Sequence, residues 1–146
     1  MEKVKTLIAG LGNTLVQDDA VGIYVCEKIK PHEMTDIFLC GVDVFRIMNV
    51  LNGHKRIILI DAVDAGLTPG AIICLNETGL NKFGNLSRSS HQISMLEAIK
   101  LMKLTLPEFQ DIEIFFAGIQ ISGMEFNSPI SEEVRISADW LAEVFL

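Results

Sequence analysis

Arg56-Ile57-Ile58-Leu59-Ile60-Asp61-Ala62 is the strongest strand signal in the chain, and the other elements can be placed relative to it. Four consecutive branched aliphatic residues are typical of a strand that is covered on both faces, as at the centre of a parallel sheet. Asp61 follows them at the carboxyl end, where open α/β sheets bind their ligands. The stretch therefore predicts a buried central strand with a polar group at its functional end.

Strand-like and helix-like segments alternate on both sides of this stretch. We expect strands at 4–10, 36–41, 71–75 and 112–117, and helices at 20–30, 45–51, 91–104 and 131–145. The turn-rich residues 63–70 are too few for a crossover helix, so the strands at 56–62 and 71–75 should form an antiparallel pair. The polar stretch 76–90 has no periodicity and is expected to be a long connection or a lid. The helix at 91–104 should turn four residues inward: Ile93, Leu96, Ile99 and Leu101.

This alternation predicts an α/β fold, a three-layer α/β/α sandwich of the phosphorylase/hydrolase-like kind. Its sheet should be twisted, mixed and mostly parallel, with about five strands. A chain of 146 residues is long enough for one core and too short for two, so residues 1–146 are interpreted as a single domain. A composition of 49% hydrophobic and 21% charged residues excludes a disordered chain.

Charge and hydropathy exclude several classes of function. The chain has 12 Lys and Arg against 19 Asp and Glu, a net charge of −7, which disfavours nucleic acids and anionic membranes as partners. No apolar run is long enough for a transmembrane helix or a signal peptide, so we expect a soluble, cytoplasmic protein. The three cysteines, Cys26, Cys40 and Cys74, stand in apolar surroundings and are expected to be buried free thiols.

The glycines at the end of the first strand raise the question of a nucleotide site. Gly10-Leu11-Gly12 contains two glycines of a dinucleotide fingerprint, but Leu15 stands at the third position. Two carboxylates, Asp18 and Asp19, precede the helix and would repel a pyrophosphate there. A nucleotide site is therefore disfavoured and remains an alternative.

Three polar groups from distant parts of the sequence are expected to meet at the carboxyl edge of the sheet. Asp19 follows the first strand, Asp61 ends the central one, and His91 follows the long connection that returns to this edge. Two carboxylates and an imidazole suit a divalent first-row ion with open coordination positions. The alternative interpretations are structural: Asp19 as a helix cap, Asp61 as the start of a turn, and His91 as an exposed residue in a first helical turn.

Four segments, in order along the chain, resemble motifs of the hydrogenase maturation endopeptidases, which trim the large subunit of nickel-iron hydrogenases. They are Gly10-Leu11-Gly12-Asn13-Thr14-Leu15-Val16-Gln17-Asp18-Asp19-Ala20-Val21-Gly22, Ile60-Asp61-Ala62-Val63-Asp64-Ala65-Gly66-Leu67-Thr68-Pro69-Gly70, Ser89-Ser90-His91-Gln92-Ile93 and Phe116-Ala117-Gly118-Ile119-Gln120. The last segment is most similar to the subgroup that serves formate hydrogenlyase-type hydrogenases. The resemblance covers nearly the whole chain.

The resemblance implies an activity, a metal and a partner. The family, classed with the aspartyl-type endopeptidases, removes a C-terminal extension from the nickel-loaded precursor of the large subunit. Asp19, Asp61 and His91 match its metal-contacting and catalytic residues, and the nickel would be presented by the substrate, although other divalent ions would fit the same ligands. No nucleic acid and no membrane insertion are expected, and the protein should be monomeric.

The sequence departs from the family after the second strand. The family has small residues after the glycine, whereas here Gly41 is followed by Val42-Asp43-Val44-Phe45. Gly41, Val42 and Asp43 are therefore expected to contact the substrate and to influence which precursor is bound. The alternative for Asp43 is that it caps the following helix.

The proposed chemistry is metal-assisted hydrolysis, in which the ion polarises the scissile carbonyl or a water and a carboxylate serves as general base. Serine and cysteine schemes fit less well, because only His91 among the histidines is suitably placed. Two rival functions stay open: a non-catalytic assembly chaperone on the same fold, and a small metal- or nucleotide-binding domain. Six other residues are interpreted as structural: His32 and His54 in solvated loops, Asp18 and Asp64 in caps or turns, and the pair Phe115 and Phe116 in the core.

Overall fold

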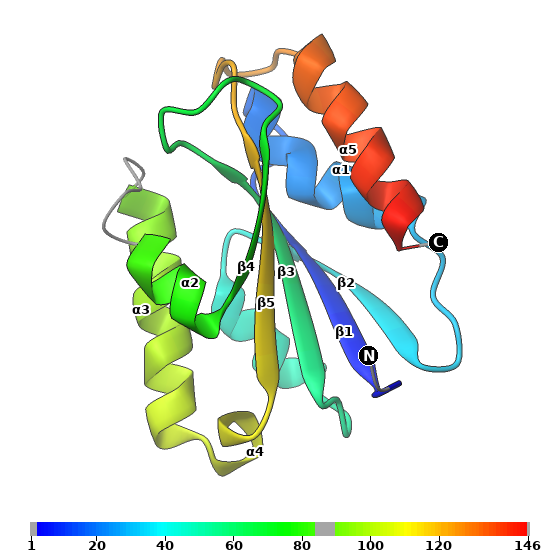
Figure 1. Cartoon of the computed structure of the whole chain (residues 1–146), viewed down its shortest axis with the longest axis vertical. Helices are drawn as coiled ribbons and strands as arrows, with labels where there is room; N and C mark the ends of the chain where they lie inside the picture. The colour runs from blue at the N-terminus through cyan, green and yellow to red at the C-terminus, as the bar shows by residue number, and fades with distance from the viewer. Residues whose placement is uncertain (1–2, 84–89, 146) are drawn as a thin grey trace.

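The structure, a computed structural model, describes the backbone of residues 3–83 and 90–145 and the side chains of 3–83 and 94–145. In chain order the elements are β1 (Thr6–Leu11), the 3₁₀ helix η1 (Gln17–Ala20), α1 (Val21–Lys28), β2 (Thr35–Gly41), the 3₁₀ helix η2 (Val44–Asn49), β3 (Arg56–Val63), β4 (Ile72–Asn76), α2 (Glu77–Phe83), α3 (Ser90–Thr105), α4 (Pro107–Gln110), β5 (Glu113–Gln120) and α5 (Glu132–Val144). Their arrangement is shown in Figure 1.

The strands form one twisted sheet in the order β2-β1-β3-β5-β4. All neighbours run parallel except β4, which is antiparallel to β5. Helices α1 and α5 cover one face, and α2, α3, α4 and η2 cover the other (Figure 1). The predicted three-layer α/β/α fold is confirmed.

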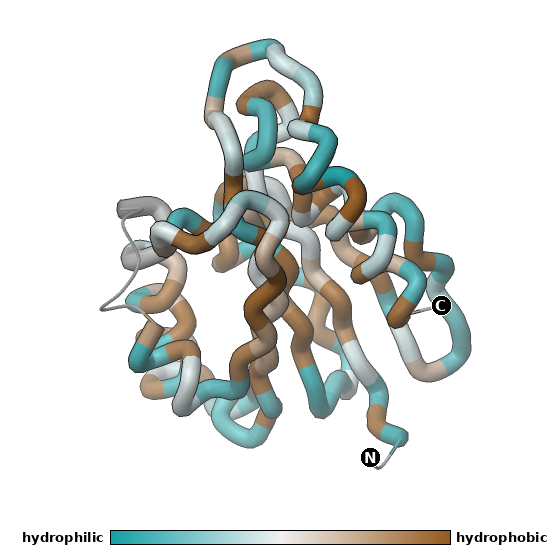
Figure 2. Tube along the Cα trace, turned by 45° about the horizontal axis from the view of Figure 1, so that its top comes forward, coloured by the Kyte–Doolittle hydropathy of each residue, from teal (hydrophilic) through white to brown (hydrophobic). Residues whose placement is uncertain are grey.

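Side chains of β3 alternate between the two helical layers, as a strand at the centre of a sandwich requires. Ile57, Leu59 and Val63 belong to the core on the α3 side, whereas Ile60 and Ala62 belong to the core on the α1 and α5 side. Figure 2 shows hydrophobic residues concentrated along the strands at the centre of the molecule. The continuous aliphatic run in β3 therefore reflects burial on both faces, as predicted.

The predicted pairing of residues 56–62 with 71–75 is wrong, although the antiparallel direction is right. β5 lies between β3 and β4 and pairs with both. β5 is almost fully buried, whereas β4 is only partly buried. The more deeply buried strand takes the interior place next to β3, and β4 takes the edge.

Several helices differ from the prediction. The stretch 76–90 was expected to lack periodic structure, but it contains α2, whose Leu80 and Phe83 pack into the core; residues 84–89 lie outside the described part of the chain. Residues 44–49 form a 3₁₀ helix rather than an α-helix, and α4 was not predicted. Short segments such as these carry too few residues for a periodic signal.

The inward face of α3 is formed by Met95, Leu96, Ala98, Ile99 and Met102. The prediction for Leu96 and Ile99 is confirmed, whereas Leu101 is exposed because it lies about 160° around the helix from Ile99, away from the core. The side chain of Ile93 lies outside the described residues.

Two of the motif glycines allow α1 to approach the sheet closely. A Cβ at Gly22 would lie 2.2 Å from the carbonyl oxygen of Ile60 and 2.4 Å from that of Leu11. A Cβ at Gly10 would lie 2.6 Å from the carbonyl oxygen of Gly22. The glycines of the first motif therefore serve the packing of α1 on β1 and β3, which brings the start of α1 to the carboxyl end of β3.

The cysteine prediction is partly wrong. Cys26 and Cys40 are buried free thiols, and burial raises their pKa values to about 12 and about 11, respectively. Cys74 is exposed, because it lies on the edge strand β4, which the helices cover incompletely. In the described part of the chain, no helix has both the length and the hydropathy needed to cross a bilayer.

Candidate functional site

Asp61 lies in β3 two residues before its carboxyl end, on the strand face that also carries Leu59 and Val63. The side chain is fully buried. Its Oδ1 accepts a hydrogen bond from the backbone N–H of Ala62 at 2.8 Å, and its Oδ2 has no hydrogen-bond partner among the described residues. Since Asp61 is inside a strand, it does not open a turn. A buried carboxylate oxygen without a donor points to a ligand that is not part of the described chain.

The residue beside Asp61 on the neighbouring strand is a glycine. In the register of β3 and β5, Asp61 lies opposite Gly118. A Cβ at this position would lie 2.5 Å from Cγ1 of Val63 and 2.7 Å from Cε1 of Phe116, so the packing there tolerates no side chain. This is the physical reason for the glycine of the last motif.

Asp19 lies in η1, at the start of the helical segment that follows β1, and is partly buried. Its Oδ2 accepts a hydrogen bond from the backbone N–H of Asn13 at 2.8 Å. Gly12, at φ +127°, passes so close to Asp19 that a Cβ would lie 1.8 Å from the Asp19 carbonyl oxygen. Asp19 thus folds the glycine loop back onto η1, and the interpretation as the cap of α1 is wrong.

The two carboxylates influence each other electrostatically. Burial, and then the neighbouring charge of Asp19, raise the pKa of Asp61 well above its usual value, and the hydrogen bond from Ala62 offsets only part of this. A cation bound by both carboxylates would relieve the repulsion and satisfy the free Oδ2. Asp19 and Asp61 therefore fit a divalent cation.

The third predicted ligand, His91, lies in the first turn of α3, and its side chain is outside the described residues, as is Ser89. Among the described side chains no cluster of three or more His, Cys, Asp or Glu could hold a metal ion. The convergence of His91 with Asp19 and Asp61 therefore stays a prediction.

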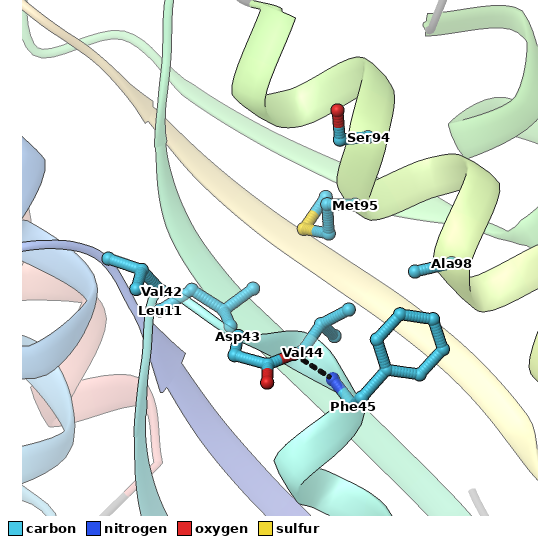
Figure 3. A pocket seen from close by; sticks show the side chains of 8 residues that line it. All are labelled: Leu11, Val42, Asp43, Val44, Phe45, Ser94, Met95 and Ala98. Atoms are coloured by element: carbon cyan, nitrogen blue, oxygen red, sulfur yellow. Dashed lines mark hydrogen bonds between the residues drawn. The ribbon is translucent and has the colours of Figure 1, made fainter.

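A cleft of about 130 Å³ separates the start of α3 from the loop after β2. Figure 3 shows Ser94, Met95 and Ala98 of α3 on one side and the residues from Val42 to Phe45 on the other. Leu11, the last residue of β1, lines it as well, so the cleft lies at the carboxyl edge of the sheet.

The loop after β2 has a fixed shape. Gly41 adopts φ +76°, which favours glycine, and Arg46 Nη1 donates to the Cys40 carbonyl at 2.6 Å. Asp43 Oδ1 accepts from the backbone N–H of Phe45 at 3.0 Å (Figure 3), so its interpretation as the cap of the following helix is confirmed. Val42 is exposed at the mouth of the cleft.

The glycine loop does not offer its amides to a phosphate. The N–H of Gly12 donates to the Gly41 carbonyl at 2.9 Å, and the N–H of Asn13 donates to Asp19. The N–H groups of Leu15 and Val16 donate to the side chain and carbonyl of Asn13. A nucleotide-binding loop keeps such groups for its ligand, so this geometry counts against a nucleotide site.

Asp18 is a structural residue of a kind that the sequence did not reveal. Its carboxylate is fully buried and accepts four hydrogen bonds, from the backbone N–H groups of Ser122, Gly123 and Ser131 and from Ser131 Oγ, at 2.7 to 2.9 Å. It fastens the loop between β5 and α5 to η1 rather than capping α1. The partners lie more than 100 residues away in the sequence, so no local pattern could have indicated them.

Gln120, at the end of the last motif, organises the loop that follows Asp61. Its Oε1 accepts from the backbone N–H groups of Ala65 and Leu67 at 2.9 and 3.2 Å, and its Nε2 lies 3.4 Å from Asp64. Asp64 thus contributes to this loop, which agrees with a turn residue. Gln120 belongs to the last motif, but its role could not be predicted from the sequence.

Two of the structural assignments of aromatic and histidine residues need correction. His54 is buried, with Nε2 2.7 Å from Asp36 Oδ2 and Nδ1 accepting from the N–H of Asn52, whereas it was expected in a solvated loop. His32 is exposed as expected. Phe116 is buried in the core as expected, whereas Phe115 is only partly buried, because it lies near the amino end of β5 beneath the Arg56 guanidinium.

Comparison with known proteins identifies the family. The family model HycI, hydrogenase maturation protease, matches residues 23–146. A putative hydrogenase maturation protease of Methanocaldococcus jannaschii is 29% identical over 156 positions, covering 100% of this chain and 97% of the relative. Protein FrxA of Pyrococcus furiosus is 29% identical over 130 residues, covering 88% and 93%.

Solved structures agree with these relatives. The chain superposes on the [NiFe] hydrogenase maturation protease HybD of Thermococcus kodakarensis with a TM-score of 0.83 and 28% identity, covering 97% of this chain and 96% of the other. The hydrogenase maturating endopeptidase HybD of E. coli has the same fold, with a TM-score of 0.82 and 17% identity over 98% and 90% of the two chains. The chain therefore belongs to the hydrogenase maturation protease family and is an endopeptidase of the α/β/α fold.

Proposed function

We propose that this endopeptidase removes the C-terminal extension of the nickel-loaded precursor of a nickel-iron hydrogenase large subunit. The match to the HycI family and the segment from Phe116 to Gln120 favour a hydrogenase of the formate hydrogenlyase type. The enzyme acts as a monomer in the cytoplasm and draws its nickel from the substrate rather than from a resident cofactor.

The observation that carries this proposal is the free Oδ2 of Asp61. A fully buried carboxylate oxygen without a donor among the described residues, in the field of a second carboxylate, costs free energy in the unliganded protein. Asp19 and Asp61 would both be ligands of a nickel ion presented by the substrate, and its charge would remove this cost. The site is therefore built for a cation that arrives with the precursor.

The proposed ligands are Asp19, Asp61 and His91. Asp19 is held by its hydrogen bond to Asn13, and Asp61 is fixed in β3, so both carboxylates are positioned before the substrate binds. Position 91 precedes Met95 by one helical turn, and Met95 lines the cleft between α3 and the loop after β2. Oxygen and nitrogen ligands of this kind suit nickel and other divalent first-row ions.

The ion, when bound, polarises the scissile carbonyl or the attacking water. A carboxylate of the site, Asp19 or Asp61, takes a proton from that water as its oxygen bonds to the carbonyl carbon. The proton then passes to the amide nitrogen as the C–N bond breaks, so that one water is consumed for each peptide released. The raised pKa of Asp61 suits this exchange, because its carboxyl group holds a proton more readily than an exposed aspartate. Two aspartates serve in this scheme, which agrees with an aspartyl-type classification.

The cleft at the carboxyl edge of the sheet receives the substrate chain next to the cut. Gly41 sets the direction of the loop, while Val42 and the Asp43 side chain face the incoming segment. Because Asp43 also caps η2, its contribution is the shape of the loop rather than a fourth metal ligand.

The test uses nickel-loaded precursor and variants that leave the fold intact. Asp19→Asn, Asp61→Asn and His91→Ala should each lower the cleavage rate about 100-fold or more, because each removes a ligand or the general base. Asp111→Asn is the matched control: it is an exposed aspartate just before β5, at the opposite end of the sheet, and should cleave at the normal rate. Mass spectrometry of the large subunit measures the lost C-terminal peptide.

The outcomes separate this proposal from its rival. Unimpaired cleavage by all three folded variants would contradict the proposed site. A precursor that binds the wild-type protein but keeps its full mass would identify an assembly chaperone instead. Cleavage that is equally fast without nickel would show that the metal is not part of recognition.

A further inference from the structure

The loops that follow β1 and β5 expose three large apolar side chains at the carboxyl end of the sheet. Leu15, Met124 and Phe126 are 54%, 45% and 74% exposed, respectively, and we call them the apolar platform. Both loops lie at the upper end of the sheet in Figure 1. Large exposed apolar side chains on neighbouring loops mark an interaction surface more often than they mark ordinary protein surface.

The platform is one structural unit rather than two separate loops. Val16 and Phe126 form an isolated antiparallel bridge, and the N–H of Asn127 donates to the Leu15 carbonyl at 2.7 Å. Side chains add to these backbone contacts: Gln17 Oε1 accepts from the N–H of Glu125 at 2.9 Å. The two segments that carry Leu15 and Phe126 therefore lie side by side, although they are 111 positions apart in the sequence.

The unit is held rigidly at its base. Gln17, at φ +35°, also donates to Ser131 Oγ at 3.2 Å, and the four hydrogen bonds of Asp18 tie the start of η1 to the loop between β5 and α5. A left-handed conformation at Gln17, and another at Asn127, costs free energy that these contacts offset. A rigid loop pair that exposes apolar groups is preorganised for binding, since little entropy is lost on association.

The platform is continuous with the proposed catalytic carboxylates. Asn13, which donates to Asp19, begins the turn that carries Leu15, and Asp18 next to Asp19 holds the second loop. A protein that rests on the platform is therefore brought directly beside the site.

The two segments that carry the platform contain acidic residues and no basic ones. Residues 12–22 and 121–134 contain no Lys or Arg, whereas Glu125 lies between Met124 and Phe126 and Glu132 and Glu133 follow in the first turn of α5. A partner with Lys or Arg around an apolar patch complements this surface, and an acidic partner would be repelled.

We propose that the platform is a docking surface for the precursor protein, separate from the cleft that takes the segment to be cut. Its occupant is an apolar patch of the precursor rimmed by Lys or Arg side chains, and this inference rests on the proposed function. Docking at the platform supplies binding energy and selects the precursor, while the cleft and the carboxylates perform the cleavage.

The test separates binding from chemistry by steady-state kinetics on nickel-loaded precursor. Leu15→Ser with Phe126→Ser should raise KM about tenfold and leave kcat within about twofold. Leu104→Ser with Trp140→Ser is the matched control: the two residues are 79% and 59% exposed, lie on α3 and α5 away from the platform, and should leave both constants unchanged. Melting temperatures of both double variants should stay close to that of the wild type, because the altered side chains are exposed.

The charge component has its own test. KM of the wild type should rise between about 50 mM and about 300 mM NaCl, and a variant with Gln in place of Glu125, Glu132 and Glu133 should lose most of this dependence. A salt-independent KM in the wild type contradicts a basic partner surface.

The result that overturns this inference differs from the one that overturns the proposed function. If the wild type cleaves the precursor and the Leu15 and Phe126 variant has an unchanged KM, the platform does not dock the precursor, whereas the proposed function stands. If the wild type neither binds nor cleaves the precursor, the proposed function itself fails. A wild-type dimer that the platform variant converts to monomer, seen by analytical ultracentrifugation, would assign the surface to a second copy of the chain and would also contradict the inference.

Discussion

At Asp61 the requirements of catalysis oppose those of stability. The carboxyl group is fully buried, one of its oxygens lacks a partner among the described residues, and the Asp19 charge lies close by. A residue selected for stability alone at this position of β3 would be apolar, like Leu59 and Val63 on the same face. The cost at Asp61 is therefore evidence for its function.

The first prediction is that Asp61→Asn stabilises the metal-free protein. Because the pKa of Asp61 is raised in the folded state, the native protein binds more protons than the unfolded chain between the two pKa values, so stability falls as pH rises through this window. The cost grows as pH rises through this window, and at neutral pH Asn, which carries no charge, should raise the free energy of unfolding by about 1–3 kcal/mol. Urea unfolding in the presence of a chelator measures this difference in the free energy of unfolding.

The gain should vanish at acid pH. Below the ordinary pKa of an aspartate both states of the wild type carry a protonated Asp61, so wild type and variant should then be about equally stable. Asp111→Asn, at an exposed position, is the control and should show no comparable gain at neutral pH. A variant that is less stable than the wild type at neutral pH would contradict an uncompensated buried charge.

Neighbouring aspartates show how far the sequence determines roles at this scale. Asp18 and Asp19 are adjacent and look alike in the sequence. Asp18, however, accepts four hydrogen bonds, whereas the charge of Asp19 raises the pKa of Asp61. The motif could indicate that the pair matters. It could not tell which carboxylate is structural, because the donors to Asp18 come from residues 122–131, whose position is decided by the tertiary fold.

At the scale of elements, the second prediction concerns the hydrogen bonds of Asp18 that join η1 to the loop between β5 and α5. Asp18→Ala leaves three backbone N–H groups, those of Ser122, Gly123 and Ser131, without an acceptor, and should lower the free energy of unfolding by about 3 kcal/mol. Hydrogen exchange at these three amides should accelerate more than at amides of β3. Urea unfolding and amide exchange measure the two effects.

A nearby acidic residue supplies the control. Glu125 lies in the same loop and its side chain is exposed, with a single hydrogen bond from Ser128 Oγ at 3.3 Å, so Glu125→Ala should change stability by less than about 0.5 kcal/mol. Equal effects of Asp18→Ala and Glu125→Ala would show that the buried hydrogen bonds do not hold the loop.

The elements themselves were predictable in proportion to the length of their apolar pattern. β3, with four consecutive aliphatic residues, and α5, with thirteen residues, were found close to their observed bounds. α2 was missed because only two of its seven residues, Leu80 and Phe83, are buried. The place of β4 was missed because strand order depends on which strand can bury both faces, and β5, which comes later in the chain, competes for the place beside β3.

For the whole molecule, the sandwich determines where chemistry can occur. The close approach of α1 through Gly10 and Gly22, and the glycine opposite Asp61, bring groups from β1, β3 and β5 to one edge of the sheet. The prediction that Asp19 and Asp61 meet there followed from parallel topology alone and agrees with the coupling of their charges. The net charge of −7 says little about the position of the site, since only two of the 19 acidic residues, Asp19 and Asp61, belong to it.

The third prediction is that a divalent cation stabilises the whole molecule through this pair. An ion that binds the folded state alone, at about ten times its Kd, adds about 1.4 kcal/mol, which corresponds to a rise of about 4 °C in Tm for a domain of this size. Because two carboxylates bind an ion weakly without the ligands that a substrate adds, millimolar Ni²⁺ should be needed at pH 7.5. Asp19→Asn and Asp61→Asn should each abolish the rise, although Asp61→Asn begins from a higher Tm. An equal rise in wild type and Asp61→Asn would show that the ion binds elsewhere on the acidic surface, and the free Oδ2 of Asp61 would then need another ligand.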